Sequence, residues 1–282
     1  MPGWFPCASY RVSSFSFARR APVCLFSPFA EAALMLARDL ARALDPVVMA
    51  QECGIQPDPW QANLLRANPR RSLLLCSRQS GKSTVAAFLV IQTALFVPAA
   101  QIVVVSPTQR QSNELFRNIV GFLSRLPGAP RPTAESKHGT ELSNGARILS
   151  LPGTEKTIRG IAGVDLVVMD EAARVEDELL TAVRPMMATK PDARLIALTT
   201  PAGKRGWFYE AWVGDDASWE RVRVSASQCP RITKEFLAEE LKALGKIKFS
   251  EEYELEFHDP EEAVFPLAII EAAFTQEVRA LW

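Results

Sequence analysis

A short segment that joins an apolar strand to a long apolar helix constrains this chain more than any other part of its sequence. The segment reads SLLLCSRQSGKST, and its four apolar residues, Leu73 to Cys76, are typical of a buried strand. Gly81-Lys82-Ser83 follows and leads directly into the helix, which is the layout of a phosphate-binding P-loop. In such a loop the backbone N–H groups face the phosphates, Lys82 reaches the β- and γ-phosphates and the Ser83 hydroxyl can hold Mg²⁺. Because Cys76 occupies the place of the usual first glycine, an ordinary strand-to-helix turn is the alternative for this segment taken alone.

A second segment supplies the acidic residues that a P-loop enzyme requires. The run from Asp165 to Glu171 reads DLVVMDE, an apolar strand that ends in adjacent carboxylates at the edge of a sheet where ligands bind. There Asp170 can hold Mg²⁺ through water, and Glu171 can polarise an attacking water. Such a pair also commonly caps a helix. Its position about ninety residues after the P-loop, with a further strand between, favours nucleotide hydrolysis.

The predicted order of strands and helices is that of an α/β fold. Gln101 to Val105 is typical of a buried parallel strand, and Thr108 to Leu126 has helical spacing with Thr108 or Ser112 as its cap. Asn144-Gly145 between apolar runs predicts a hairpin. Other elements are expected at 31–44, 62–67, 85–97, 176–187, 194–198, 206–212, 219–224 (an edge strand) and 233–244, the last capped by Thr233 and followed by Gly245. We therefore expect an α/β P-loop NTPase of the ASCE/RecA-like type, with a mainly parallel central sheet flanked by helices on both faces.

Composition limits the class of protein. The 282 residues include 32 basic and 32 acidic ones, so any DNA binding depends on local basic pairs such as Arg70-Arg71 and Lys204-Arg205. Five scattered cysteines without a C-x-x-C pair fit a reducing cytoplasm and exclude a cysteine-based zinc site. No apolar run reaches the ~20 residues of a membrane span, so no membrane partner is expected. The acidic run from Glu251 to Glu262 has the spacing of a solvated helix face, which argues against a metal nuclease site there.

Two further segments have both a functional and a structural interpretation. Trp60-Gln61 could stack on and hydrogen-bond an adenine, or Trp60 could cap the core at a helix start. Thr199-Thr200-Pro201 follows a strand, where its hydroxyls could sense the γ-phosphate or simply end the strand.

In combination, these segments resemble one family, the large subunit of the phage terminase, which is a DNA-packaging motor. The resemblance covers roughly residues 36 to 282. The features that carry it are Pro59-Trp60-Gln61, the glycine-poor Ser77 to Ser83, Arg159-Gly160 ahead of Val167 to Ala172, Thr199-Thr200-Pro201, and the block from Glu252-Tyr253 to Val264-Phe265.

The resemblance implies a role for each matching position. The ATP-binding residues would be Trp60, Gln61, Ser77, Arg78, Gln79, Ser80, Gly81, Lys82, Ser83 and Thr84. The catalytic residues would be Glu171, Arg78 and Lys82, with Arg78 acting as a cis arginine finger or γ-phosphate sensor. Ser83 and Asp170 would hold the metal, and Thr199, Thr200 and Pro201 would couple hydrolysis to movement.

The resemblance also implies cofactors and partners. The expected reaction is Mg²⁺-dependent hydrolysis of ATP to ADP and phosphate, used to pump double-stranded DNA into a procapsid. The expected partners are the terminase small subunit, the portal protein and other copies of the chain in a ring, and the expected location is the cytoplasm of a bacterial host.

The expected domain division is a poorly ordered extension at 1–30, a P-loop ATPase domain at 31–265 and a linker stub at 266–282. Family members continue past a Val-Phe block into a nuclease domain, whereas only 17 residues follow Phe265, so DNA cleavage by this chain is not expected. The nuclease could be encoded separately, or the chain could be a fragment or a prophage remnant that binds nucleotide or phage partners without work. A helicase-like DNA-dependent ATPase is a further alternative, although no second RecA-like domain follows.

Overall fold

The computed structural model describes residues 28–259 and 273, apart from 137, 155–157 and 159. An eight-stranded sheet forms its centre, with the strand order β3-β4-β5-β2-β6-β7-β1-β8. The strands are β1 (Arg71–Cys76), β2 (Gln101–Ser106), β3 (Pro132–Ser136), β4 (Gly139–Leu142), β5 (Arg147–Pro152), β6 (Leu166–Asp170), β7 (Arg194–Thr199) and β8 (Glu220–Val224). All neighbouring strands from β5 to β8 pair in parallel, and the two antiparallel pairs, β3 with β4 and β4 with β5, lie at one edge.

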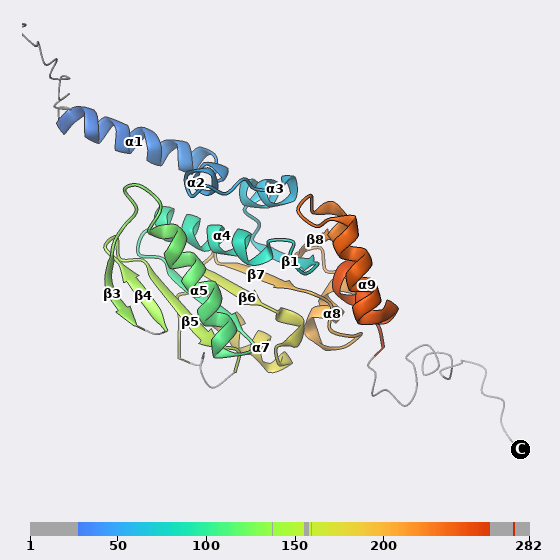
Figure 1. Ribbon diagram of the computed structural model, residues 1–282. Coiled ribbons are helices and arrows are strands. Elements are labelled where there is room, and N and C mark those ends of the chain that lie inside the picture. Colours follow the sequence, from blue (N-terminus) through green and yellow to red (C-terminus); the bar gives the residue numbers. More distant parts are fainter. Residues whose placement is uncertain (1–27, 137, 155–157, 159, 260–272, 274–282) are drawn as a thin grey trace, which may run out of the picture.

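Helices cover both faces of this sheet (Figure 1). They are α1 (Pro28–Leu44), α2 (Val47–Glu52), α3 (Pro59–Ala67), α4 (Lys82–Phe96), α5 (Gln109–Leu123), α7 (Asp177–Met186), α8 (Gly206–Val213) and α9 (Lys234–Phe249). Short turns of helix lie at η1 (Ala172–Arg174), η2 (Ala226–Gln228) and η3 (Ser250–Glu254). None of the helices in this described part combines the length and apolar character that a membrane crossing requires.

The alternation of side chains along each strand produces one core on each face. Leu74 of β1 packs into the core beneath α4 and α5, whereas its neighbours Leu73 and Leu75 pack into the core beneath α7 and α8. Both cores contain side chains that are fully shielded from water, as expected of strands in a parallel sheet covered on both sides. The predicted α/β architecture, with a mainly parallel sheet and helices on both faces, is confirmed.

Several local predictions are also confirmed. Asn144-Gly145 lies in the turn between β4 and β5, β8 is an edge strand, and Thr108 Oγ1 accepts a hydrogen bond from Gln111 N at 3.3 Å to cap α5. Thr233 caps α9, and Gly245 leaves the helical conformation at φ 75° and ψ 167°.

Three details differ from the sequence-based expectation, and two expected segments lie mostly outside the described residues. The chain resumes a helix after Gly245, up to Phe249, and strand β3 was not expected. The short acidic stretch after α9 is not a uniformly solvated face, because Glu252 is 2% exposed. The expected extension at 1–30 lies outside the described residues except for 28–30, which begin α1. Most of the expected stub at 266–282 is likewise not described.

The helix that follows the P-loop packs against α5 through a pair of aromatic rings. Phe88 of α4 is 1% exposed and stacks on Phe122 of α5 with 4.7 Å between ring centroids. We expect Phe88→Ala to lower the free energy of unfolding by about 3–5 kcal/mol, because it removes this contact and leaves a cavity. Urea denaturation measures the change. Phe96→Ala, at a phenylalanine of the same helix that is 38% exposed, is the matched control and should cost less than about 1 kcal/mol. Equal losses for the two variants would contradict the assignment of Phe88 to the core.

Candidate functional site

Three neighbouring strands bring the predicted site residues to one edge of the sheet. Strand β7 lies between β6 and β1, so Asp170, Thr199 and the P-loop all lie at the carboxyl ends of adjacent parallel strands. The Nζ atom of Lys82 lies 2.7 Å from Oε1 of Glu171. The expected convergence of Lys82, Asp170 and Thr200 is therefore present in the structure.

The P-loop turns sharply without the usual first glycine. Cys76 occupies the position of that glycine, but it is the last residue of β1 and is fully buried. The turn therefore begins after it, at Ser77. The Ser80 hydroxyl donates to the Ser77 carbonyl at 2.8 Å inside the turn, and Gln79 and Gly81 take positive φ values of 60° and 86°. Burial raises the pKa of the Cys76 thiol to about 12, which makes it unreactive.

Gly81 is favoured by its backbone conformation, and two side chains approach it closely. A Cβ atom at this position would lie 2.6 Å from Gln61 Nε2 and 3.1 Å from Arg231 Nη2. Gln61 Nε2 donates to the Gly81 carbonyl at 3.0 Å, while Gln61 Oε1 accepts from Asp58 N at 2.8 Å in the capping box of α3. The amide of Gln61 is therefore held against the P-loop by the start of its own helix.

A cleft of about 660 Å³ opens beside the P-loop, a size typical of sites for small ligands. Of the predicted ATP-binding residues, those that line it are Gln61, Arg78, Gln79, Gly81, Lys82, Ser83 and Thr84. Ser77 and Ser80 are fully buried within the turn. Trp60 packs against the core beneath α4 instead of lining the cleft, so its role in adenine binding stays a prediction.

The cleft also includes residues that sequence reasoning did not select. Arg231 makes an ion pair with Asp58, with Nη2 2.8 Å from Oδ2, and donates to the Ser80 carbonyl at 3.1 Å. Gly54, Ile55 and Gln56 form another part of the wall. These residues lie in irregular segments before α3 and after β8, and no local pattern in the sequence marks them.

Glu171 is fixed by two cations. Its Oε1 atom pairs with Lys82, and its Oε2 atom lies 2.7 Å from Arg174 Nη1. Burial acts to raise the pKa of Glu171, but Lys82, Arg174 and Arg78 outweigh it and hold the pKa below its usual value. Glu171 has φ 53° and ψ 44°, a left-handed conformation that costs roughly 1–3 kcal/mol in a non-glycine residue and is concentrated at functional sites.

Asp170 and Ser83 supply the kind of ligands that Mg²⁺ prefers. Asp170 is 8% exposed, and burial together with the charge of Glu171 raises its pKa to about 6. Among the described residues, no group of three or more His, Cys, Asp or Glu side chains could hold a metal on its own. One carboxylate and one hydroxyl beside a phosphate site fit Mg²⁺, which usually binds one or two protein ligands together with substrate phosphates and water.

The predicted coupling segment is linked to Glu171 through Arg174. Arg174 Nη1 donates to Thr200 Oγ1 at 2.9 Å, and Arg174 Nη2 donates to the Pro201 carbonyl at 3.3 Å. Thr199 Oγ1 accepts from Ala173 N at 3.3 Å and is fully buried. All three predicted coupling residues are thus one contact away from the segment that carries Glu171.

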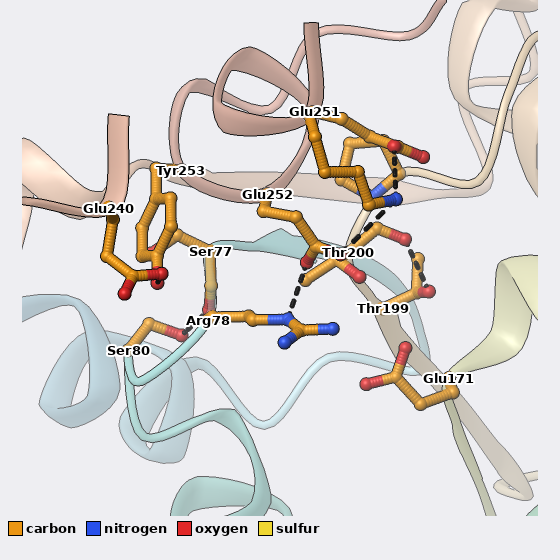
Figure 2. Close-up of polar contacts among 12 residues, drawn as sticks. Ser77, Arg78, Ser80, Glu171, Thr199, Thr200, Glu240, Glu251, Glu252 and Tyr253 are labelled. Carbon is orange, nitrogen blue, oxygen red and sulfur yellow. Dashed lines mark hydrogen bonds and ion pairs between the residues drawn. The ribbon is translucent and has the colours of Figure 1, made fainter. Parts of the chain in front are cut away.

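Arg78 projects from the P-loop and is held by Glu252 (Figure 2). Its Nε atom donates to Glu252 Oε2 at 2.7 Å, although the two residues are 174 positions apart in the sequence. The Arg78 side chain remains 60% exposed and lines the cleft.

The raised pKa of Asp170 predicts how stability depends on pH in the chain without metal or nucleotide. Between the unfolded value near 3.8 and the folded value of about 6, the unfolded chain loses this proton before the folded chain does. The free energy of unfolding of the wild type should therefore fall relative to that of Asp170→Asn as pH rises from 4 to 7, by up to roughly 3 kcal/mol. Urea denaturation of both proteins across this range provides the test, and parallel profiles would contradict it.

Comparison with known proteins identifies relatives of the part of the chain that holds the P-loop, Asp170 and Glu171. The sequence profile of the family described as terminase large subunit, T4likevirus-type, N-terminal, matches residues 73–272. The chain is 28% identical to the large subunit of the terminase of Escherichia phage T5 over 230 residues, which are 77% of this chain and 51% of that protein. It is 27% identical to the Thermus virus P23-45 large subunit over 184 residues, which are 56% of this chain and 36% of that protein. The chain thus spans about half or less of the length of these curated relatives.

Solved structures share the fold. The large terminase ATPase domain of Thermus phage P74-26 superposes with a TM-score of 0.63 at 21% identity, covering 74% of this chain and 96% of that one. The HK97 bacteriophage large terminase matches with a TM-score of 0.60 at 18% identity, over 71% of this chain and 50% of that one. These likenesses confirm the predicted P-loop fold, and the family match over most of the sequence places this chain in the terminase large subunit family, at its N-terminal region.

Proposed function

We propose that the chain is an ATPase whose hydrolysis of ATP drives the movement of double-stranded phage DNA during packaging. The single observation that carries the proposal is the contact chain Lys82–Glu171–Arg174–Thr200 at the mouth of the P-loop. It joins a phosphate-binding lysine, an ionised carboxylate and the end of the next strand. The relatives' names support it, because one solved relative is called a large terminase ATPase domain and another, a large terminase from a thermophilic bacteriophage, is described in complex with ATP-gamma-S.

From this geometry we assign a separate role in ATP hydrolysis to each of these residues. ATP phosphates enter beside Lys82 and the start of α4, where the first N–H groups of a helix have no partner within it. A phosphate at Lys82 competes with Glu171 for the ammonium group, so binding releases Glu171 Oε1 to accept a proton from the attacking water. Ser83 and Asp170 would hold Mg²⁺, which offsets the negative charge that builds on the phosphates. Arg78 lines the same cleft and offers a further cation to the transferred phosphoryl group.

The same contacts would pass the result of hydrolysis onward. Arg174 shares its guanidinium between Glu171 and Thr200. A change in the position of Glu171 would therefore alter the contacts of Arg174 with the end of β7. We assign Thr199, Thr200 and Pro201 to this coupling. The terminase small subunit, the portal protein and a ring of identical chains are part of the proposal as partners.

A basic pocket offers a place for the DNA backbone. Arg70, Arg71, Arg184 and Lys190 line a cavity of about 220 Å³ without an acidic residue among the lining residues. Lys190 is neutralised by Asp165 at 2.9 Å, which leaves three arginines. Arg71 starts β1, so this pocket lies at the opposite edge of the sheet from the P-loop that follows β1. Guanidinium groups match phosphate geometry, and we propose that this pocket contacts a DNA phosphate.

The ATPase proposal is tested by hydrolysis rates with and without linear double-stranded DNA. We expect DNA to raise the wild-type rate, and Glu171→Gln to lower it about 10²–10⁴-fold, because the amide cannot accept the proton from water. Lys82→Ala should abolish detectable turnover through the loss of phosphate binding. Lys242→Ala, at an exposed lysine of α9, is the control and should keep the rate. Absence of hydrolysis by the well-folded wild type would contradict the proposal and favour a nucleotide-binding remnant.

The DNA contact is tested by the salt dependence of binding. Replacing Arg71 or Arg184 with alanine should reduce the slope of log affinity against log salt by about 1 unit, because each contact with a phosphate releases condensed counterions. Fluorescence anisotropy with linear duplexes measures the slope for each variant and for Lys242→Ala. If Arg71→Ala and Arg184→Ala keep the wild-type slope, the pocket does not bind the DNA backbone.

A further inference from the structure

Glu252 is a buried carboxylate that belongs to a different part of the chain from the P-loop it contacts. It lies on η3, after α9, and its side chain is 2% exposed. A carboxylate removed from water in this way requires positive partners. Glu252 has two, since Oε2 lies 2.7 Å from Arg78 Nε and Oε1 lies 3.5 Å from Lys248 Nζ.

The contact between Glu252 and Arg78 is double. The Arg78 backbone N–H donates to the Glu252 carbonyl at 3.1 Å, while the side chains form their charged hydrogen bond at 2.7 Å. The backbone bond fixes where residue 78 lies, and the side-chain bond fixes the direction in which its guanidinium points. Replacing the Glu252 side chain can therefore change the direction of the guanidinium without removing the backbone hydrogen bond that positions residue 78.

Glu252 binds the Nε atom of the Arg78 guanidinium and neither of its terminal nitrogens. Only Nε is engaged, and in the described part of the chain the two terminal nitrogens of Arg78 make no hydrogen bond. In Figure 2 the guanidinium points away from Glu252 and toward Glu171, and the charge of Arg78 acts on the pKa of Glu171. A carboxylate that sequestered Arg78 would be expected to bind two guanidinium nitrogens at once, as bidentate pairs do. Glu252 instead binds Nε alone and leaves both terminal nitrogens open to the cleft.

Glu252 is held in place by the contacts of its neighbour Tyr253 with α9. Tyr253 donates its hydroxyl to Glu240 Oε2 at 2.8 Å, and its ring packs 5.2 Å from that of Phe249 and 6.1 Å from that of Phe236. Residues 246–253 therefore fold back along the first part of α9 from the break at Gly245, and we call residues 233–254 the α9 hairpin. Glu252 is carried by this braced hairpin and not by a free loop.

We propose that Glu252 is a positioning residue, which holds Arg78 by its Nε atom so that the two terminal nitrogens meet the γ-phosphate of a bound nucleoside triphosphate. The inference rests on the proposed function, because it assigns the γ-phosphate to the cleft. Its physical basis is preorganisation: a long flexible arginine is fixed before the ligand arrives, so less conformational freedom is lost on binding. The alternative is that the ion pair only ties the α9 hairpin to the P-loop.

The deciding experiment compares the affinity for ATP-γ-S, an ATP analogue that is hydrolysed only slowly, with the affinity for ADP, by titration with Mg²⁺ present. Arg78→Ala should lose most of the wild-type preference for the triphosphate. Glu252→Ala should reduce the preference for ATP-γ-S over ADP by about 10-fold or more, while its affinity for ADP stays within about 2-fold of the wild-type value, because only the γ-phosphate contact depends on Arg78. Glu252→Gln keeps an oxygen that can accept from Nε and should give a partial loss. The double variant Arg78→Ala/Glu252→Ala should be no worse than Arg78→Ala.

Controls separate positioning from folding and from the proposed function. Glu251→Gln removes the neighbouring carboxylate, which pairs with Lys248 at 2.6 Å, and should keep the wild-type preference. Thermal unfolding of each variant reports any loss of stability. If Glu252→Ala and Glu252→Gln unfold at lower temperature but discriminate ATP-γ-S from ADP as the wild type does, the pair is only a tether and the inference is wrong. A folded wild type that binds neither nucleotide would overturn the proposed function and this inference together.

Discussion

The parallel pairing of β7 between β6 and β1 is the constraint on which the site depends. It sets the separation between the strand that ends in Asp170 and the strand that leads into the P-loop, and within that separation Lys82 and Glu171 form their 2.7 Å ion pair. Two fully shielded cores hold the three strands in register, so the sheet sets where the backbone segments that carry this lysine and this carboxylate begin.

The parts of the fold that were predictable from sequence are those governed by local physics. Gln101–Ser106 is a β-branched run, Thr108 is a cap and Gly145 is a turn residue, and each of these signals acts over a few neighbouring positions. The P-loop and the DE pair were predictable for the same reason, since each consists of consecutive residues whose chemistry requires that order. Strand β3 was not, because its position depends on pairing with β4 and not on its own apolar pattern.

The contacts that sequence analysis missed join distant segments. Arg231 reaches Asp58 and Ser80, and Glu252 reaches Arg78, across more than a hundred positions in each case. An arginine in an irregular loop and one glutamate within an acidic run have no periodicity that distinguishes them from solvated surface. Glu252 was predicted to lie on a solvated face for this reason, and burial against the P-loop overrides that expectation. Trp60, for which the sequence left base stacking and core packing open, packs against the core.

The break at Gly245 has a mechanical consequence. A straight helix across the 21 residues between Arg231 and Glu252 would separate them by about 31 Å, yet both side chains reach the P-loop, at Ser80 and Arg78. Arg231, two residues before the α9 hairpin, and Glu252, near its end, are thus both bonded to the same short loop. A displacement of Ser80 relative to Arg78 would therefore reach this segment through both contacts at once, and the residues near Gly245, which lie farthest along the chain from either contact, would be displaced most.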